Sequence, residues 1–169
     1  MQKIIISNVK DAKCDWDANL NKTFDPDGKH KHSYEFKRSN ISQPYAQGWG
    51  NLEVNFITLE PGKASSPYHY HTANDEMFYI IKGEGTLKTP DGEKSVSEGD
   101  AIIFPAHENG AHMLINTSDS PIVYIDLKAI NASGEICIQP ETNKFVVLDP
   151  NLMMKVYDID STINLLKDC

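Results

Sequence analysis

The 169-residue sequence contains very little arginine, and this limits the ligands that it could bind. Arg38 is the only arginine among 16 basic residues. A guanidinium group grips a carboxylate or phosphate with two parallel hydrogen bonds, whereas a lysine ammonium acts as a point charge. A site that clamps a phosphosugar or a dicarboxylate through several arginines therefore cannot be built from this chain alone.

The sequence also lacks an excess of positive charge. Its 16 basic residues stand against 24 acidic ones, which gives a formal net charge of −8. Nucleic acids and anionic membrane surfaces are both negatively charged, so this balance argues against either as a partner. We expect a small-molecule ligand instead.

Cysteine is scarce, and long hydrophobic runs are absent. Cys14, Cys137 and Cys169 are far apart and form no CxxC pair, so we expect free thiols in a reducing compartment. The apolar run at residues 4–6 is too short for the hydrophobic region of a signal peptide, and no later run reaches the length of a membrane span. These absences predict a cytoplasmic protein.

Short segments rich in β-branched and aromatic residues are separated by turn residues along the chain. They cover residues 52–59, 76–82, 85–89, 93–97, 101–104, 111–116, 122–128 and 144–148. Such spacing is typical of an all-β sandwich or barrel. No run of helical period separates the segments, and residues 161–167 fit either a short helix or a final strand.

A change in composition divides the chain into three parts. We expect a polar N-terminal arm at residues 1–50, a barrel core at 51–130, and a C-terminal extension at 131–169. The extension is expected to pack on the barrel or on a partner. The length of the chain fits a single domain.

Four of the six histidines lie between residues 69 and 112. His69 and His71 are two apart, so in a strand both imidazoles point to the same face. Glu76 follows after a turn, and His112 lies on a later predicted strand. If the strands close into a barrel, three imidazoles and one carboxylate can converge, a set that suits borderline divalent transition metals.

The spacing of these residues and of the surrounding glycines resembles the two motifs of the cupin superfamily. The first motif appears here as Gly62, His69, His71, Glu76 and Gly83. The second motif appears as Gly99, Pro105, His112 and Asn116. The resemblance covers about residues 50–130 and is nearest to small single-domain cupins of the conserved-barrel type.

This resemblance implies a double-stranded β-helix (jelly-roll) barrel with N- and C-terminal extensions. It implies one divalent transition metal, which could be Fe, Mn, Ni, Zn or Cu, and it implies a homodimer. The residues that the resemblance makes metal ligands are His69, His71, Glu76 and His112. It assigns no catalytic residue and no further cofactor.

The sequence departs from the cupin pattern in two places. The spacer between Gly62 and His69 is one residue longer than in the family. His107 stands where the second motif has a glycine, and residues 108–111 lengthen the loop that follows. His107 is expected to be an exposed loop residue, with a general base at the barrel mouth as the alternative.

A second HxH pair, His30 and His32 followed by Glu35, could imitate a metal site. Lys29 and Lys31 alternate with these histidines, and two ammonium groups repel a cation. We therefore predict a solvated loop there.

Two kinds of function remain open at this point. The first is a small metalloenzyme, a metal-dependent oxidoreductase or isomerase, which acts on a small oxygenated molecule by dioxygenation, isomerisation or decarboxylation. The alternative is a non-catalytic barrel that binds or senses a small molecule through its metal. The shortage of arginine disfavours phosphosugar isomerases and dicarboxylate decarboxylases. It leaves neutral, phenolic or thiol substrates open, with Lys63 or Lys82 as weaker anion contacts.

Overall fold

The computed structural model describes residues 7–42, 51–130, 134–148 and 154–161. Its regular elements are, in chain order, β1 (Trp16–Asn19), α1 (Asn21–Phe24), β2 (Ser33–Asn40), β3 (Leu52–Leu59), β4 (Lys63–Ala64), β5 (Tyr70–His71), β6 (Glu76–Lys82), β7 (Glu84–Thr89), β8 (Gly92–Ser97), β9 (Ala101–Phe104), the 3-10 turn η1 (Glu108–Gly110), β10 (Met113–Ile115), β11 (Ile122–Ala129), β12 (Glu135–Gln139), β13 (Lys144–Leu148), β14 (Met154–Asp158) and the 3-10 turn η2 (Ile159–Ser161). The predicted all-β class is confirmed.

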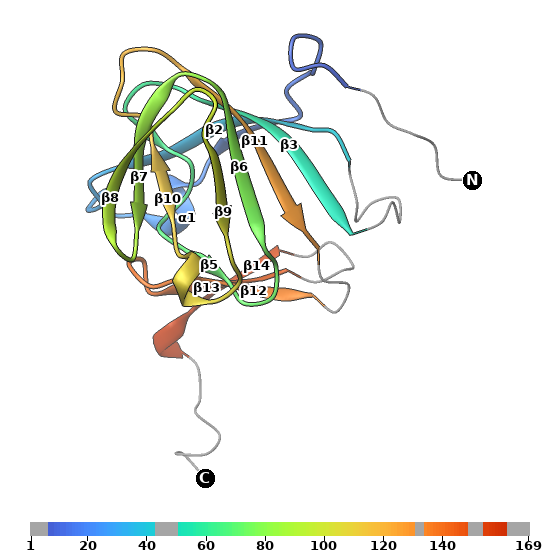
Figure 1. Ribbon diagram of the computed structural model, residues 1–169. Coiled ribbons are helices and arrows are strands. Elements are labelled where there is room, and N and C mark those ends of the chain that lie inside the picture. Colours follow the sequence, from blue (N-terminus) through green and yellow to red (C-terminus); the bar gives the residue numbers. More distant parts are fainter. Residues whose placement is uncertain (1–6, 43–50, 131–133, 149–153, 162–169) are drawn as a thin grey trace.

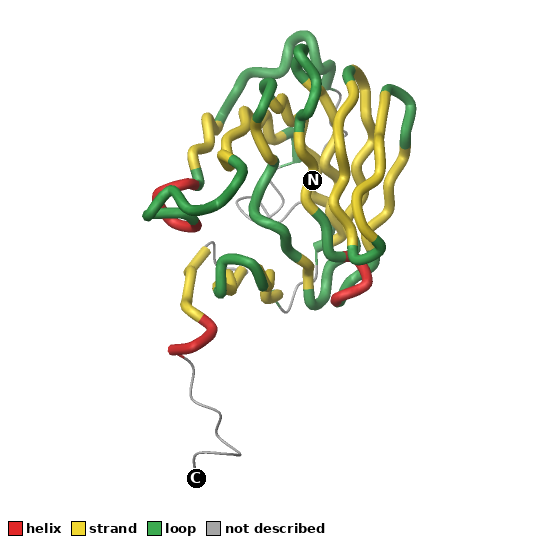
Figure 2. Tube along the Cα trace, turned by 90° about the vertical axis from the view of Figure 1, so that its left-hand side faces the viewer, coloured by secondary structure: helices red, strands yellow, loops and turns green. Residues whose placement is uncertain are grey.

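The strands form two sheets. The larger follows the order β8-β7-β10-β4-β2-β3-β11-β6-β9, with β1 added beside β2, and the smaller follows β14-β13-β12-β5. The large sheet is strongly curved, and the small sheet lies across one end of the large sheet (Figure 1). Figure 2 shows the same two sheets from the side, with the strands of the small sheet below those of the large one.

Most predicted strands are present within a residue or two of their expected ends. The bounds of β3, β6, β9 and β13 match the prediction, and β7 and β8 form the hairpin expected around Pro90–Gly92. The strands β1, β2, β4, β5, β12 and β14 were not predicted. Strands β4 and β5 have only two residues each, which is too short for an alternating pattern. Strand β2 is polar along most of its length, so it shows no clear alternation of polar and apolar residues. Most of segment 161–167 lies outside the described residues.

The main core fills the inside of the curled sheet. Strand β11 pairs with β3 on one side and with β6 on the other, which places Tyr124 beside Ile57 and Ile80. The side chains of Leu59, Ile80 and Ile122 are completely buried. This packing fixes the register of β6 and β11, which carry Glu76, Asp126 and Lys128.

Residues from both ends of the chain reach the same region of the barrel. Strand β2 pairs antiparallel with β3 and parallel with β4, so residues 33–40 extend the large sheet of their own chain. Strand β12 pairs with β5 and places Cys137 opposite His71. The segments flanking the predicted core thus form walls around its open end.

Among the residues that the structure describes, no helix has the length and apolar character needed to cross a membrane.

Candidate metal centre and pocket

The four predicted ligands come from three separate parts of the chain. His71 ends β5, Glu76 begins β6, and His112 immediately precedes β10. His69 and His112 form an isolated antiparallel bridge, in which each backbone N–H donates to the carbonyl of the other at 3.1 and 2.9 Å. This bridge brings the two rings to a centroid separation of 4.5 Å.

The Glu76 carboxylate lies at the centre of the histidine rings. Its Oε2 is 3.0 Å from Nε2 of His71 and 3.2 Å from Nε2 of His112. The potential ligand atoms of His69, Glu76 and His112 all lie within 4.8 Å of one another. All four residues are less than one tenth exposed. The structure therefore brings together the residues that the sequence analysis selected.

Each histidine is held at its Nδ1 atom by an oxygen outside the cluster. The Nδ1 atoms of His69 and His112 lie 2.9 and 2.8 Å from the carbonyl oxygens of Pro67 and Gly110. That of His71 lies 2.7 Å from Glu135 Oε1. Such contacts favour a proton on Nδ1 and leave the Nε2 lone pair facing inward, the arrangement that metal-ligating histidines commonly show.

The inward-facing atoms fit a bound cation. Nε2 of His71, Nε2 of His112 and Oε2 of Glu76 are buried, face one another, and have no other hydrogen-bond partner among the described residues. If both histidines are neutral, all three atoms are acceptors, and acceptors this close need a proton or a metal ion between them. Nitrogen and carboxylate oxygen together suit a borderline divalent metal.

The pKa values of His69 and Glu76 are shifted in the directions that favour the binding of a cation. Burial, followed by repulsion from His112 and His71, holds the pKa of His69 well below its usual value. Burial opposes a charge on Glu76, but Lys128 and His71 hold the pKa of its carboxyl well below the usual range. His69 therefore offers a neutral nitrogen and Glu76 an ionised oxygen.

The pKa of His71 is shifted in the opposite direction from that of His69. Burial and the positive charge of Lys128 lower the pKa of His71, but Glu76 and Glu135 outweigh both and raise it to about 9. The His71 ring lies between these two carboxylates, with Glu135 at Nδ1 and Glu76 at Nε2. A metal ion would take the place of a proton at Nε2.

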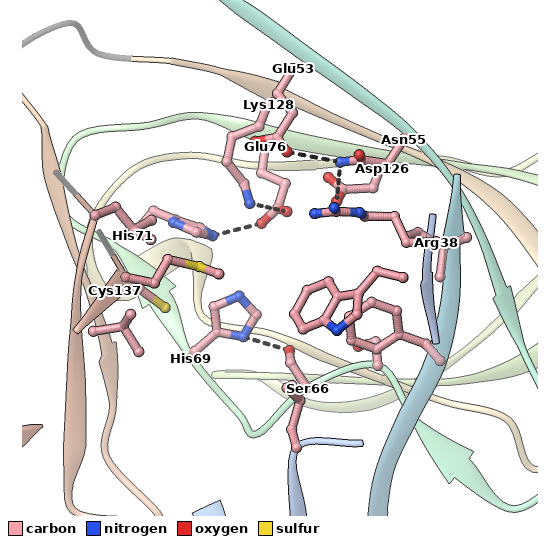
Figure 3. A pocket seen from close by; sticks show the side chains of 18 of the residues that line it. Arg38, Glu53, Asn55, Ser66, His69, His71, Glu76, Asp126, Lys128 and Cys137 are labelled. Carbon is pink, nitrogen blue, oxygen red and sulfur yellow. Dashed lines mark hydrogen bonds and ion pairs between the residues drawn. The ribbon is translucent and has the colours of Figure 1, made fainter. Parts of the chain in front are cut away.

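A cavity of about 760 Å³ opens from this cluster towards the N-terminal strands. Polar side chains from β2, β3 and β11 surround part of it, including Arg38, Asn55, Asp126 and Lys128 (Figure 3). The remaining lining is mostly apolar and includes Trp16, Phe36, Val146 and Val156. The cavity can accept a molecule that has both polar and apolar faces.

Sequence reasoning missed several of the polar residues in this cavity. Lys128 Nζ lies 3.2 Å from Glu76 Oε1, and the Asn55 side-chain amide donates to Asp126 Oδ2 at 3.3 Å. Burial and the nearby Glu76 carboxylate raise the pKa of Asp126 to about 8, against the opposite effect of Lys128. The alternation of Tyr124, Asp126 and Lys128 along one strand face could have revealed them.

The anion contacts expected from the sequence lie elsewhere. Lys63 forms an ion pair with Glu35 at 3.1 Å, and neither Lys63 nor Lys82 lines the cavity. Arg38 does line it, held by Asp15 at 3.2 Å and placed over the Trp16 ring at 4.9 Å.

The other two sequence candidates lie outside the cluster. His30 and His32 are in the loop before β2, as predicted, and neither belongs to a group of three or more potential metal ligands among the described residues. His107 is exposed, as expected, and its side chain does not line the main cavity. Its backbone N–H donates to the carbonyl of His71 at 2.6 Å, and its φ is 74°.

Comparison with known proteins relates this chain to the family that its sequence motifs resemble. A family model described as the cupin domain matches residues 55–128. Glucose-6-phosphate isomerase from Thermococcus litoralis is 34% identical over 97 residues, which make up 49% of this chain and 50% of that protein. The chain therefore spans only about half the length of this curated relative.

Two solved structures share most of the fold. A sugar phosphate isomerase of the cupin superfamily from Silicibacter pomeroyi matches with a TM-score of 0.68 and 23% identity, over 92% of this chain and 93% of that one. A proposed sugar phosphate isomerase from Acidithiobacillus ferrooxidans matches with a TM-score of 0.64 and 26% identity, over 76% and 81%.

Proposed function

This chain carries a cupin domain on a double-stranded β-helix barrel, and we propose that it is a metal-dependent isomerase of a small hydroxylated carbonyl compound. The observation that carries the proposal is the convergence of three buried imidazoles and one buried carboxylate at the end of a 760 Å³ cavity. The likeness to proteins named as sugar phosphate isomerases supports this reaction over dioxygenation or decarboxylation.

In this proposal His69, His71, Glu76 and His112 hold one divalent transition metal. Three neutral imidazoles and one carboxylate leave such an ion with a net charge of about +1, so it can polarise a carbonyl or hydroxyl oxygen of a bound molecule. Mn, Fe, Ni, Zn and Cu all accept nitrogen and oxygen ligands of this kind, and supply in the cell decides among them.

The polar side of the cavity supports a hydroxylated substrate. Asp126 Oδ1 is buried and has no hydrogen-bond partner among the described residues, so it can accept a hydrogen bond from a substrate hydroxyl. Lys128 and Asn55 hold this part of the wall through their contacts with Glu76 and Asp126. A substrate hydroxyl bound here would lie next to the metal centre.

Arg38 supports a substrate with one anionic group. It lines the cavity, and its contacts with Asp15 and Trp16 hold the guanidinium in place while engaging only part of its five donors. The chain still cannot supply several arginines to clamp an anion, but a single phosphate or carboxylate group can be bound by one arginine. We therefore propose a phosphorylated or carboxylated sugar as the substrate.

The test is turnover of a substrate panel by protein loaded in turn with Mn, Fe, Co, Ni and Zn. We expect interconversion of an aldose phosphate and its ketose isomer, and much weaker activity on the unphosphorylated sugars. Arg38→Lys should raise KM while leaving kcat close to the parent value. No turnover of any sugar by protein that holds one metal ion per chain would overturn the isomerase proposal.

One observation favours the non-catalytic alternative. The titratable groups beside the centre are partly engaged, since Lys128 pairs with Glu76 and Oδ2 of Asp126 accepts from Asn55, which leaves Oδ1 of Asp126 open. A barrel that binds or senses a sugar without converting it would show a ligand-dependent rise in Tm, with no product detected.

A further inference from the structure

Cys137 lies beside the proposed metal centre on a strand that the cupin motifs do not cover. It belongs to β12 and pairs directly opposite His71 of β5, on the same side of the cavity (Figure 3). Its Sγ and the potential ligand atoms of His69 and His71 all lie within 4.8 Å of one another. Three different donors are therefore grouped there within reach of one ion.

We propose that Cys137 is an additional ligand of the metal centre, and that its sulfur makes the centre favour thiophilic divalent ions such as zinc. The inference rests on the metal centre proposed above. Thiolate ligands select softer metals, whereas carboxylate and water suit harder ones such as manganese. Cys137 would join His69 and His71 on one side of the centre, beside the group formed by His69, Glu76 and His112.

A second observation points to a ligand at the same place. His71 is 5% exposed, and its Nε2 atom faces Glu76 Oε2 at 3.0 Å but has no other partner among the described residues, so two acceptors face each other beside Cys137. Cys137 is 7% exposed and also contacts an apolar cluster that includes Val146. An alanine or valine could fill the same apolar space, so packing does not explain why a sulfur atom lies beside two imidazoles.

The ligation step balances without an oxidant or reductant. The metal–sulfur bond forms as the S–H bond breaks, and the thiol proton leaves to solvent. Together with Glu76, a bound thiolate would neutralise the charge of a divalent ion. No electron is transferred, so the proposal needs no further reactant.

Cobalt(II) is the probe that tests this, because a thiolate bound to cobalt gives a near-ultraviolet charge-transfer band that nitrogen and oxygen ligands do not give. We expect the band in the cobalt-loaded parent and its loss in Cys137→Ser. The matched control is the double variant Cys14→Ser/Cys169→Ser, which leaves Cys137 as the only thiol and should keep the band. Zinc affinity should fall about tenfold or more in Cys137→Ser, as for other changes around metal sites.

The outcomes separate this inference from the proposed function. If cobalt binds the parent one to one without the band, Cys137 is not a ligand and the metal centre stands. If the parent binds no cobalt, both proposals fail. Should Cys137→Ser not fold, X-ray absorption of the zinc-loaded parent decides, since a sulfur neighbour lies at about 2.3 Å from zinc and nitrogen or oxygen lies closer.

Discussion

Each histidine of the proposed centre is fixed by an acceptor at Nδ1, so the removal of one ring leaves a gap that no neighbour fills. In His71→Ala we expect most of the bound metal to be lost. The buried Glu135 carboxylate also loses its partner, which should cost about 1–3 kcal/mol of unfolding free energy. Metal analysis and urea denaturation of the purified variant measure both effects.

The matched control for this change is His30→Ala/His32→Ala. These histidines also form an HxH pair, but they lie in the loop before β2. We expect the double variant to hold metal like the parent. Loss of metal there, with metal retained in His71→Ala, would place the site elsewhere.

The pH dependence of metal affinity should report the proton on His71. Its pKa is raised to about 9 by Glu76 and Glu135, so below that value a proton occupies the position that the metal needs. Apparent affinity should rise about tenfold per pH unit between roughly 6.5 and 9, and then level off. Titration with a metal-buffering chelator measures this slope, and an affinity that is flat across the range would contradict it.

His107 has a backbone conformation that favours glycine. Its φ of 74° lies in the left-handed region, and the cupin motif has a glycine at this position. Strain of this kind costs about 1–3 kcal/mol. We expect His107→Gly to raise the unfolding free energy by about 1 kcal/mol after the entropy cost of glycine.

The control for that prediction is His107→Ala, which keeps the strain and also keeps the backbone hydrogen bond to His71. Urea denaturation of both variants without metal should separate them. Equal stability of the two would show that the strained φ has no measurable cost.

At the scale of elements, the turn η1 positions His112. A Cβ at Gly110 would lie 1.9 Å from the carbonyl oxygen of Pro105, so the turn must move in Gly110→Ala. The Gly110 carbonyl accepts from Nδ1 of His112, and the shift would therefore disturb that ring. We expect lower stability, by about 1–3 kcal/mol, together with weaker metal binding.

Gly99→Ala is the control at this scale. Gly99 has a φ of 93°, but a Cβ there would meet no atom within 4 Å. This variant should lose stability through backbone strain while its metal affinity stays like that of the parent. Similar metal loss in both variants would mean that general destabilisation, and not the position of His112, weakens the site.

At the scale of the whole molecule, the homodimer stays a prediction, and one surface suits it. Strand β9 is an edge of the large sheet. Its Ile103 is 72% exposed, and Tyr79 of the neighbouring strand β6 is 39% exposed. Light scattering should show a dimer at micromolar concentration, and Ile103→Asp should convert it to a monomer. Ser95→Asp adds the same charge on exposed β8 and should leave the dimer intact. A monomeric parent would refute the prediction.

The sequence by itself determined the strand-rich class, and its resemblance to the cupin motifs selected the four candidate ligands. Alternation along 52–59 and 76–82 is a local pattern, and it depends on one sheet face being buried and the other partly exposed. The two-residue spacing of His69 and His71 likewise fixes a shared face before any packing is known. Both of these local patterns can be recognised in the sequence because they need only neighbouring residues.

Only the tertiary structure decided what surrounds those ligands. Glu135 lies 64 residues from His71 in the sequence, yet it anchors that ring. Cys137 reaches the centre through the pairing of β12 with β5, and Arg38 reaches the cavity through the pairing of β2 with β3. Strand pairing over such distances is set by the packing of the whole barrel, and no local pattern records it.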